Sequence, residues 1–151
     1  LFICFVAQRT TVSGDSMYPT LHNRDNLIVD KISYRFHDPK RYDVIVFPYQ
    51  YEEHTYFIKR VIGLPGETVE IHDGQIFIDG SKTPLKDVTT KEFMQGSFGP
   101  YTVPDNCYFV MGDNRNNSKD SRYWEHTFVT DDEIVGKAFL RYWPLNKIKF
   151  L

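Results

Sequence analysis

Short apolar runs separated by polar turns recur along the chain and set the expected fold. Residues 27–29 and 44–47 are rich in β-branched side chains, and residues 56–62 form a longer apolar run that ends at a turn containing Gly and Pro. Similar runs return at 108–111 and 137–143. Apolar runs of this length, bounded by turn formers, predict β-strands. We therefore expect a mainly β domain.

The clearest local prediction is a β-hairpin centred on the Asp-Gly pair at 73–74. Asp-Gly suits the two positive-φ positions of a type I′ turn. Such a turn pairs Ile71 with Ile76 and Val69 with Ile78, which places these apolar side chains on one face. The hydrophobic pattern and the turn chemistry thus predict the same register.

Two further segments carry weaker predictions of local structure. Residues 79–101 are richer in Gly, Lys, Thr and Ser and show weak periodicity, which is typical of a surface excursion or small subdomain. Thr130 and Glu133 have the spacing of a capping box, which predicts one short helical turn. The fold should therefore contain few helices, all of them short.

The N-terminal residues break the pattern of a soluble domain. Residues 1–7 are continuously apolar, and Gln8 and Arg9 follow as the first polar positions. A membrane span needs about 20 apolar residues, so this run alone cannot cross a bilayer. It is either the end of a longer apolar segment or a buried first strand, and the residues leave both readings open.

Composition narrows the class of protein only modestly. The chain has 151 residues, 41% of them hydrophobic and 25% charged, as expected for one folded domain. With 18 Lys and Arg against 20 Asp and Glu, it has no general electrostatic attraction to nucleic acid. Cys4 and Cys107 are too few for a disulfide framework, and the scattered His residues lack metal-ligand spacing. We expect no cofactor and no metal.

The first candidate for chemistry is Ser16, in the sequence SGDSMYPTL at 13–21. Gly14 permits unusual dihedral angles, and Pro19 makes the end of the turn rigid. Ser16 could thus lie on a stiff turn with its backbone N–H free to donate. By itself this segment fits an ordinary polar turn better.

The second candidate is Lys59, within the apolar run at 56–62. Strand alternation places Phe57, Lys59 and Val61 on one face and Arg60 on the other, so one of the two cations points towards a buried face. Burial lowers the pKa of a lysine, and a neutral amine can accept the proton of a serine hydroxyl. The commoner alternative is an edge strand from which both cations reach water.

The third candidate is the loop at 112–122, which is dense in short polar side chains and alternating charges. Asp120 and Arg122 could form an internal contact, and Ser118 could orient a neutral amine. A solvated loop without a function would look nearly the same.

Taken together and in this order, the three segments resemble the bacterial type I signal peptidases. The matching stretches are SGDSMYPTL at 13–21, YFIKRVIGLPGE at 56–67, GDNRNNSKDSR at 112–122, IVGKA at 134–138 and RYWP at 141–144. The joint occurrence of three motifs in order is highly specific, whereas any single one is much weaker.

The resemblance implies a membrane-bound serine endopeptidase with a Ser-Lys dyad. Ser16 would be the nucleophile and Lys59 its general base, Ser118 would hydrogen-bond the Lys59 amine, and Asp120 and Arg122 would form a supporting ion pair. The amide of Ser16 would donate to the oxyanion. Many relatives carry a second donor, a serine, two residues before the nucleophile; here that position is Gly14, so the side-chain donor is missing.

The resemblance also implies the substrate, the location and the division of the chain. The substrates would be signal peptides of secretory preproteins, cleaved after Ala-x-Ala-like sites at the extracytoplasmic face of the plasma membrane. Residues 9–67 and 102–151 would form a β catalytic core with a small inserted β subdomain at 68–101, and residues 1–8 would be the end of a truncated transmembrane segment. The small side chains before the cleavage point would contact an apolar lining made of Val12, Met17, Leu21, Phe57 and Ile58.

The resemblance implies membrane lipid as a second partner, and we expect no nucleic acid partner. The oligomeric state stays open. Exposed aromatic residues chosen from Phe2, Phe5, Trp124 and Trp143 would dip into the membrane interface. Two alternatives remain. One is a self-cleaving Ser-Lys protease of the repressor type, and the other is a non-catalytic β-rich module that binds peptides.

Overall fold

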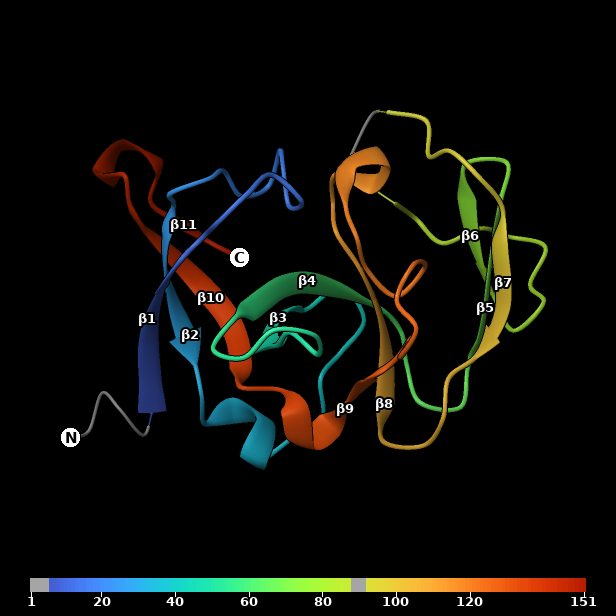
Figure 1. Cartoon of the computed structure of the whole chain (residues 1–151), viewed down its shortest axis with the longest axis horizontal. Helices are drawn as coiled ribbons and strands as arrows, with labels where there is room; N and C mark the ends of the chain where they lie inside the picture. Colours follow the sequence, from blue (N-terminus) through green and yellow to red (C-terminus); the bar gives the residue numbers. More distant parts are fainter. Residues whose placement is uncertain (1–5, 88–91) are drawn as a thin grey trace.

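The computed structural model describes residues 6–87 and 92–151 as two β-sheets joined by loops and short 3₁₀ turns (Figure 1). The strands are β1 (Ala7–Thr11), β2 (Asn26–Asp30), β3 (Val44–Pro48), β4 (Tyr56–Gly63), β5 (Thr68–His72), β6 (Gln75–Ile78), β7 (Phe98–Thr102), β8 (Cys107–Met111), β9 (Val129–Thr130), β10 (Gly136–Trp143) and β11 (Lys149–Phe150). The 3₁₀ turns are η1 (Ser33–Arg35), η2 (Arg115–Asn117), η3 (Asp131–Glu133) and η4 (Leu145–Lys147). The expected mainly β architecture with few short helices is confirmed.

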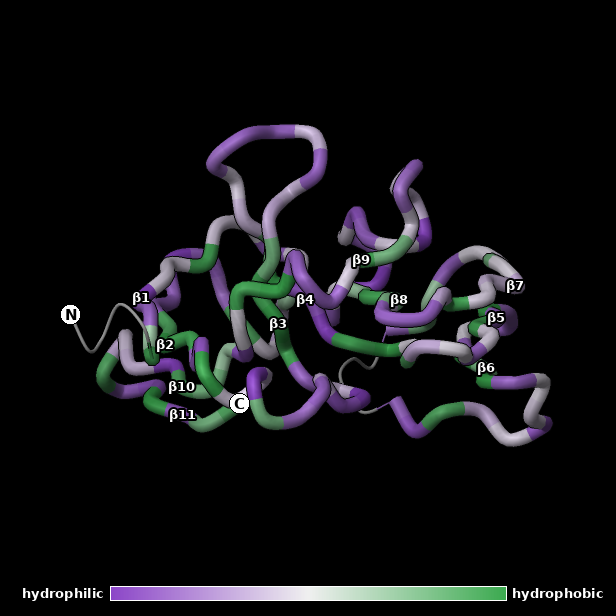
Figure 2. Tube along the Cα trace, turned by 90° about the horizontal axis from the view of Figure 1, so that it is seen from below, coloured by the Kyte–Doolittle hydropathy of each residue, from purple (hydrophilic) through white to green (hydrophobic). Residues whose placement is uncertain are grey.

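The larger sheet holds the three segments that carry the candidate chemistry. Its strands run in the order β1-β2-β10-β3-β4-β8-β9, with β11 paired to β10, and every pairing is antiparallel. Strand β4 therefore lies inside the sheet, between β3 and β8. Figure 2 shows apolar positions concentrated along β3 and β4, while the connection between them projects as a polar loop.

The smaller sheet is formed by β6, β5 and β7, and it contains the predicted hairpin. Val69 pairs with Ile78 and Ile71 with Ile76, which confirms the predicted register. The turn residue Asp73 has a φ of 53°, as a type I′ turn requires. Val69, Ile71 and Ile76 pack against Ile62 and Phe109 of the larger sheet, so one shared core joins the two sheets.

Strand β7 falls in the segment at 79–101, whose pattern did not predict it. Its sequence is Phe-Gly-Pro-Tyr-Thr, and Gly and Pro are both depleted in strands. Proline is tolerated here because β7 is an edge strand that pairs with β5 alone. The polar strand β1 also lacks an apolar alternation, and β9 and β11 are two residues each, too short to leave a pattern.

The predictions for the capping box and for the N-terminal apolar run have different outcomes. The capping box at Thr130 and Glu133 is present, and η3 follows it. Residues 1–5 of the expected apolar segment lie outside the described residues, and Ala7 and Gln8 begin β1, where they pair with β2. Within residues 6–87 and 92–151, we find no helix with the length and apolar character needed to span a membrane.

Candidate active site

The structure brings Ser16 and Lys59 into direct contact. Ser16 lies in the connection between β1 and β2, and Lys59 lies in the middle of β4. Lys59 Nζ donates a hydrogen bond to Ser16 Oγ over 2.7 Å. Two polar residues separated by 43 positions in the chain thus form one hydrogen-bonded pair.

Lys59 is buried because of where β4 lies. The flanking strands β3 and β8 remove the open edge along which a lysine could reach water, and the residue is only 3% exposed. The ring of Phe57 covers the amine, with its centroid 5.0 Å from Nζ, as expected from strand alternation. The edge-strand alternative for Lys59 is therefore wrong.

Burial also controls the protonation of Lys59. Desolvation lowers the pKa of its amine to about 8, because the protein interior stabilises the charged form less well than water does. The negative charge of Asp120 opposes this effect, and the positive charge of Arg122 adds to it. A substantial fraction of the amine is then neutral near physiological pH.

Two asparagines fix the loop that carries Ser16. The Asn114 backbone N–H donates to the Ser16 carbonyl oxygen at 2.9 Å, and its side-chain Nδ2 donates to the Asp15 carbonyl at 3.0 Å. On the other side of the loop, the Gly14 N–H donates to Asn23 Oδ1 at 2.9 Å. Gly14 has a φ of 91°, which side chains rarely tolerate. Neither asparagine was singled out from the sequence: the contacts of Asn114 span 98 and 99 positions and leave no local pattern, and the contact of Asn23 spans nine positions within a polar turn that offers several possible acceptors.

Gly112 allows the loop after β8 to pack against the Ser16 loop. A Cβ atom at this position would lie 2.5 Å from the Ser16 carbonyl oxygen and 2.2 Å from Ser118 Oγ. Both distances are far shorter than van der Waals contact, so only glycine fits between these two groups. The requirement for Gly112 comes from close approach and not from its dihedral angles.

Ser118, Asp120 and Arg122 form a buried polar cluster beside the reactive pair. Arg122 donates from Nε and Nη2 to the two carboxylate oxygens of Asp120, at 2.9 Å each. Ser118 Oγ donates to Asp120 Oδ2 at 2.9 Å. The hydrogen bond expected between Ser118 and Lys59 is not formed in the described part of the chain, so that expectation is corrected. A buried carboxylate needs several donors, and the Ser118 hydroxyl is one of them.

Arg60, the neighbour of Lys59, points to the opposite face of β4. It donates two hydrogen bonds to the buried Asp113, from Nε at 2.8 Å and from Nη2 at 2.7 Å. Thr20 Oγ1 donates to the same carboxylate at 2.6 Å. Asp113 therefore links the loop that carries Ser16 to β4, which the sequence pattern did not indicate.

A cleft of about 290 Å³ opens beside Ser16 and Lys59. Four of the five residues expected to form its apolar lining are present, namely Val12, Met17, Phe57 and Ile58. Leu21 does not line the cleft. It is fully buried and packs behind Met17 in the core.

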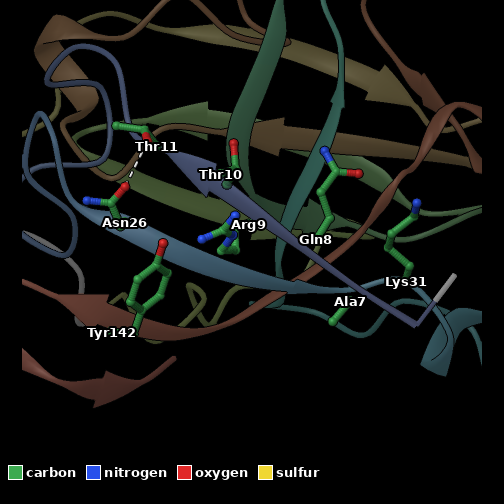
Figure 3. A pocket seen from close by; sticks show the side chains of 8 residues that line it. All are labelled: Ala7, Gln8, Arg9, Thr10, Thr11, Asn26, Lys31 and Tyr142. Carbon is green, nitrogen blue, oxygen red and sulfur yellow. Dashed lines mark hydrogen bonds between the residues drawn. The ribbon is translucent and has the colours of Figure 1, made fainter. Parts of the chain in front are cut away.

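Two other hollows have linings without Ser16 or Lys59. The larger, about 760 Å³, follows β1 and is bordered by Arg9, Asn26, Lys31 and Tyr142 (Figure 3). It contains neither Ser16 nor Lys59. A second hollow of about 560 Å³ lies beyond the loop at 116–119 and is rich in aromatic side chains.

Comparisons with known proteins point to one family. Residues 1–143 match the family described as "Signal peptidase, peptidase S26". "Probable signal peptidase I-2" of Synechocystis sp. is 41% identical over 152 residues, covering 97% of this chain and 68% of the relative. "Signal peptidase I" of Leptolyngbya laminosa is 43% identical, covering 95% of this chain and 72% of the relative. A crystal structure of a signal peptidase I from Enterococcus faecalis is 35% identical, with a TM-score of 0.56, and the match covers 66% of this chain and 95% of that one.

Proposed function

Because the chain belongs to the signal peptidase family, peptidase S26, we propose that it removes N-terminal signal peptides from exported preproteins, with Ser16 as nucleophile and Lys59 as general base. Family membership makes the protein a serine peptidase, a hydrolase. The observation that supports the dyad most directly is the 2.7 Å contact between Ser16 Oγ and the buried Lys59 Nζ.

In the first step, the neutral Lys59 amine takes the proton of the Ser16 hydroxyl. The Ser16 oxygen then attacks the carbonyl carbon of the scissile peptide bond, and the electron pair of the C=O bond moves onto its oxygen. The distance of 2.7 Å is suited to direct proton transfer without an intervening water molecule.

In the second step, the oxyanion returns its electron pair and the C–N bond breaks. The protonated Lys59 gives its proton to the departing nitrogen, which leaves as the amino terminus of the mature chain. Water then attacks the acyl-Ser16 ester, with Lys59 again serving as the base, and the signal peptide leaves with a free carboxyl group.

The oxyanion is stabilised by the backbone N–H of Ser16, and the Gly14 region of the same loop holds this amide in place through the bond from the Gly14 N–H to Asn23. Among the hydrogen bonds of the described residues, none uses the Ser16 N–H as donor, so this group is available to the substrate. Gly14 contributes no side-chain donor, and the rigid loop geometry set by Asn23 and Asn114 compensates by pre-orienting the amide.

Ser118, Asp120 and Arg122 act as positioning residues and not as members of the dyad. The carboxylate of Asp120 also accepts a hydrogen bond from the Gly112 N–H at 3.0 Å. The cluster thereby holds Gly112 against the Ser16 carbonyl group and keeps the loop at its reacting distance. Its role is to keep Ser16 Oγ within hydrogen-bonding distance of Lys59 Nζ.

The cleft accepts small side chains before the scissile bond, in agreement with cleavage after Ala-x-Ala-like sites. Val12 and Met17 are 5% and 2% exposed and are fixed by the core, so the lining cannot move to admit a bulky group. Ile58 and Phe57 complete the wall on the side of β4. Leu21 supports Met17 from behind.

The same proposal covers the organisation and location of the protein. Residues 9–67 and 102–151 form the catalytic core and residues 68–101 an insertion, a division supported by the separate small sheet. The enzyme is anchored at the plasma membrane with its core on the extracytoplasmic face. Contact with lipid is supported by four exposed apolar side chains near the C-terminus: Trp143, Leu145, Ile148 and Phe150.

The test is cleavage of a preprotein with an Ala-x-Ala junction by the purified protein. Ser16→Ala and Lys59→Ala should each abolish the reaction, whereas Lys82→Ala, at an exposed lysine of the smaller sheet's loops, should cleave normally. Retained activity in either dyad variant contradicts the assignment. Cleavage of the protein's own chain in place of the preprotein would support a self-cleaving protease, and binding of signal peptides without cleavage would support a peptide-binding module.

A further inference from the structure

An aromatic trough, defined here by Tyr49, Tyr51, Tyr123 and Trp124, lies next to the catalytic cleft and has no part in the chemistry described above. It has a volume of about 560 Å³. Tyr51 and Tyr123 are 48% and 56% exposed, which is unusual for side chains with so much apolar surface. Exposed aromatic residues gathered around one hollow indicate a binding surface.

The trough is continuous with the cleft that holds the reactive pair. Asn117 and Lys119 line both hollows. The two also share a wall, because the Phe57 ring that covers the Lys59 amine stacks on Tyr49, with ring centroids 4.2 Å apart and planes 19° apart. A chain lying in the cleft can therefore continue into the trough without leaving the surface.

The trough is preformed in the free protein. The Tyr51 hydroxyl accepts hydrogen bonds from the backbone N–H groups of Glu125 and His126, at 3.0 and 3.3 Å. The Trp124 ring packs edge-on against Phe47 of the core, with centroids 5.9 Å apart. Because these contacts fix the aromatic rings before a ligand arrives, little side-chain entropy is lost on binding.

We propose that the aromatic trough binds the first residues of the mature chain, on the carboxyl side of the scissile bond. The inference rests on the proposed function. Residues before the bond occupy the part of the cleft lined by Val12, Met17 and Ile58. The leaving nitrogen takes its proton from Lys59, and Asn117 and Lys119 border both the cleft and the trough, so the segment that follows this nitrogen can continue past them into the trough.

The chemistry of the trough defines the ligand as an extended polypeptide with apolar or aromatic side chains near its new amino terminus. The faces of the exposed tyrosines offer apolar contact area that is not selective for one side chain, and the largely buried Trp124 adds only a small part of its ring. Lys119 and Glu125, both exposed, border the trough with opposite charges, so it has no preference for a strongly charged segment of either sign.

Binding can be tested directly, because the chain has only two tryptophans, Trp124 in the trough and the distant, half-exposed Trp143. In ¹⁵N-labelled Ser16→Ala protein, the two indole N–H resonances report on these two sites without cleavage. A junction peptide with six mature residues should shift the Trp124 resonance and leave the Trp143 resonance unchanged. The same peptide ending at the scissile position should shift neither. Equal shifts of Trp124 with both peptides, or none with either, would overturn the inference.

A kinetic test separates failure of this inference from failure of the proposed function. Two substrates share the signal side and end two or six residues after the junction. We expect the longer one to have a kcat/KM about tenfold higher, and Tyr123→Ala to reduce this ratio by about fivefold through lost aromatic contact. Phe36→Ala, which truncates an 81% exposed aromatic residue outside the trough, should leave the ratio unchanged. Equal kcat/KM values for both substrates contradict the trough alone, whereas no cleavage of either contradicts the proposed function.

Discussion

At the scale of single residues, Lys59 shows how a fold lowers the pKa of an ordinary cation. The residue itself is not unusual; its surroundings are, since two neighbouring strands and the Phe57 ring exclude water from the amine. The cost of desolvation is what makes the neutral form available. The environment that makes the neutral amine available also lowers the stability of the folded protein. Its effects on activity and on stability can both be measured.

The first consequence is the dependence of activity on pH. In the proposed mechanism catalysis requires neutral Lys59, and desolvation lowers the pKa of this amine to about 8. The value of kcat/KM should rise about tenfold per pH unit below that pKa and level off above it. Initial rates on a junction peptide across this range test the expectation, with circular dichroism to verify that the protein stays folded. A rate independent of pH through the neutral range would contradict Lys59 as the base.

The second consequence concerns stability. The pKa of Lys59 falls from 10.5 to about 8 on folding, so below pH 8 the folded state bears the full cost of a buried charge. That cost is about 3 kcal/mol, and it is relieved as pH rises from about 8 to 10.5, because the unfolded chain binds more protons in this window. Lys59→Met should therefore be inactive yet more stable at pH 7 by about 2 kcal/mol, allowing for imperfect packing. Urea unfolding at pH 7 and at pH 10 measures the gain, which should shrink at the higher pH.

At the scale of elements, the site is an assembly of two loops on one strand. The loop with Ser16 and the loop at 112–122 meet at Gly112, and both are connected to β4 through Asp113 and Arg60. Asp113 accepts from Thr20 on one side and from Arg60 on the other, so a single carboxylate sets the distance between the loop that carries Ser16 and strand β4.

Gly112→Ala tests whether this loop contact sets the reacting geometry. The added Cβ would clash with the Ser16 carbonyl oxygen at 2.5 Å, so one loop must move. We expect a loss of about 2 kcal/mol of stability and a fall in kcat of about 100-fold. Gly80→Ala is the matched control. It has a φ of 69° and no atom within 4 Å of the new Cβ, so it should cost stability through strain without lowering kcat.

Element prediction from sequence succeeded where local pattern and local chemistry agreed. The hairpin around Asp73 and the strand β4 are such cases, since apolar alternation and turn residues specified both. It failed at β7, whose Gly and Pro are tolerated only because the strand lies at an edge. Edge position is a tertiary property and leaves no mark in the local sequence.

Prediction of the candidate site also succeeded where local motifs were present and failed where the outcome depends on tertiary structure. Motifs in the sequence pointed to Ser16 and Lys59, and the structure places these two residues in contact. The partner of Ser118 was expected to be Lys59, but the Ser118 hydroxyl donates its hydrogen bond to the carboxylate of Asp120, because a buried anion needs donors. Which of two nearby acceptors a hydroxyl serves is decided by burial, and burial of a loop residue is not readable from its neighbours in sequence.

At the scale of the whole molecule, the two ends of the long axis have different characters. The small sheet of β5, β6 and β7 lies at one end, and β1, β2, β10 and β11 lie at the other, together with the C-terminus (Figure 1 and Figure 2). Leu145 and Phe150 at this second end are 66% and 74% exposed. Apolar side chains this exposed on a short hairpin would be a solubility defect unless another apolar phase covers them.

We expect that phase to be a lipid surface, and vesicle binding tests it. Trp143, Leu145, Ile148 and Phe150 alternate with Lys147 and Lys149, so the segment offers apolar groups to the interface and positive charges to anionic headgroups. Co-sedimentation with phosphatidylglycerol-containing vesicles should show binding that weakens by about five- to tenfold in Phe150→Ala, as expected for one partly buried aromatic side chain. Phe36→Ala removes a similarly exposed ring at the end of η1. This variant should bind the vesicles as the unaltered protein does. Equal weakening in both variants would mean that the vesicles take up exposed aromatic residues in general, and the C-terminal hairpin would then have no special part in orienting the cleft towards the membrane.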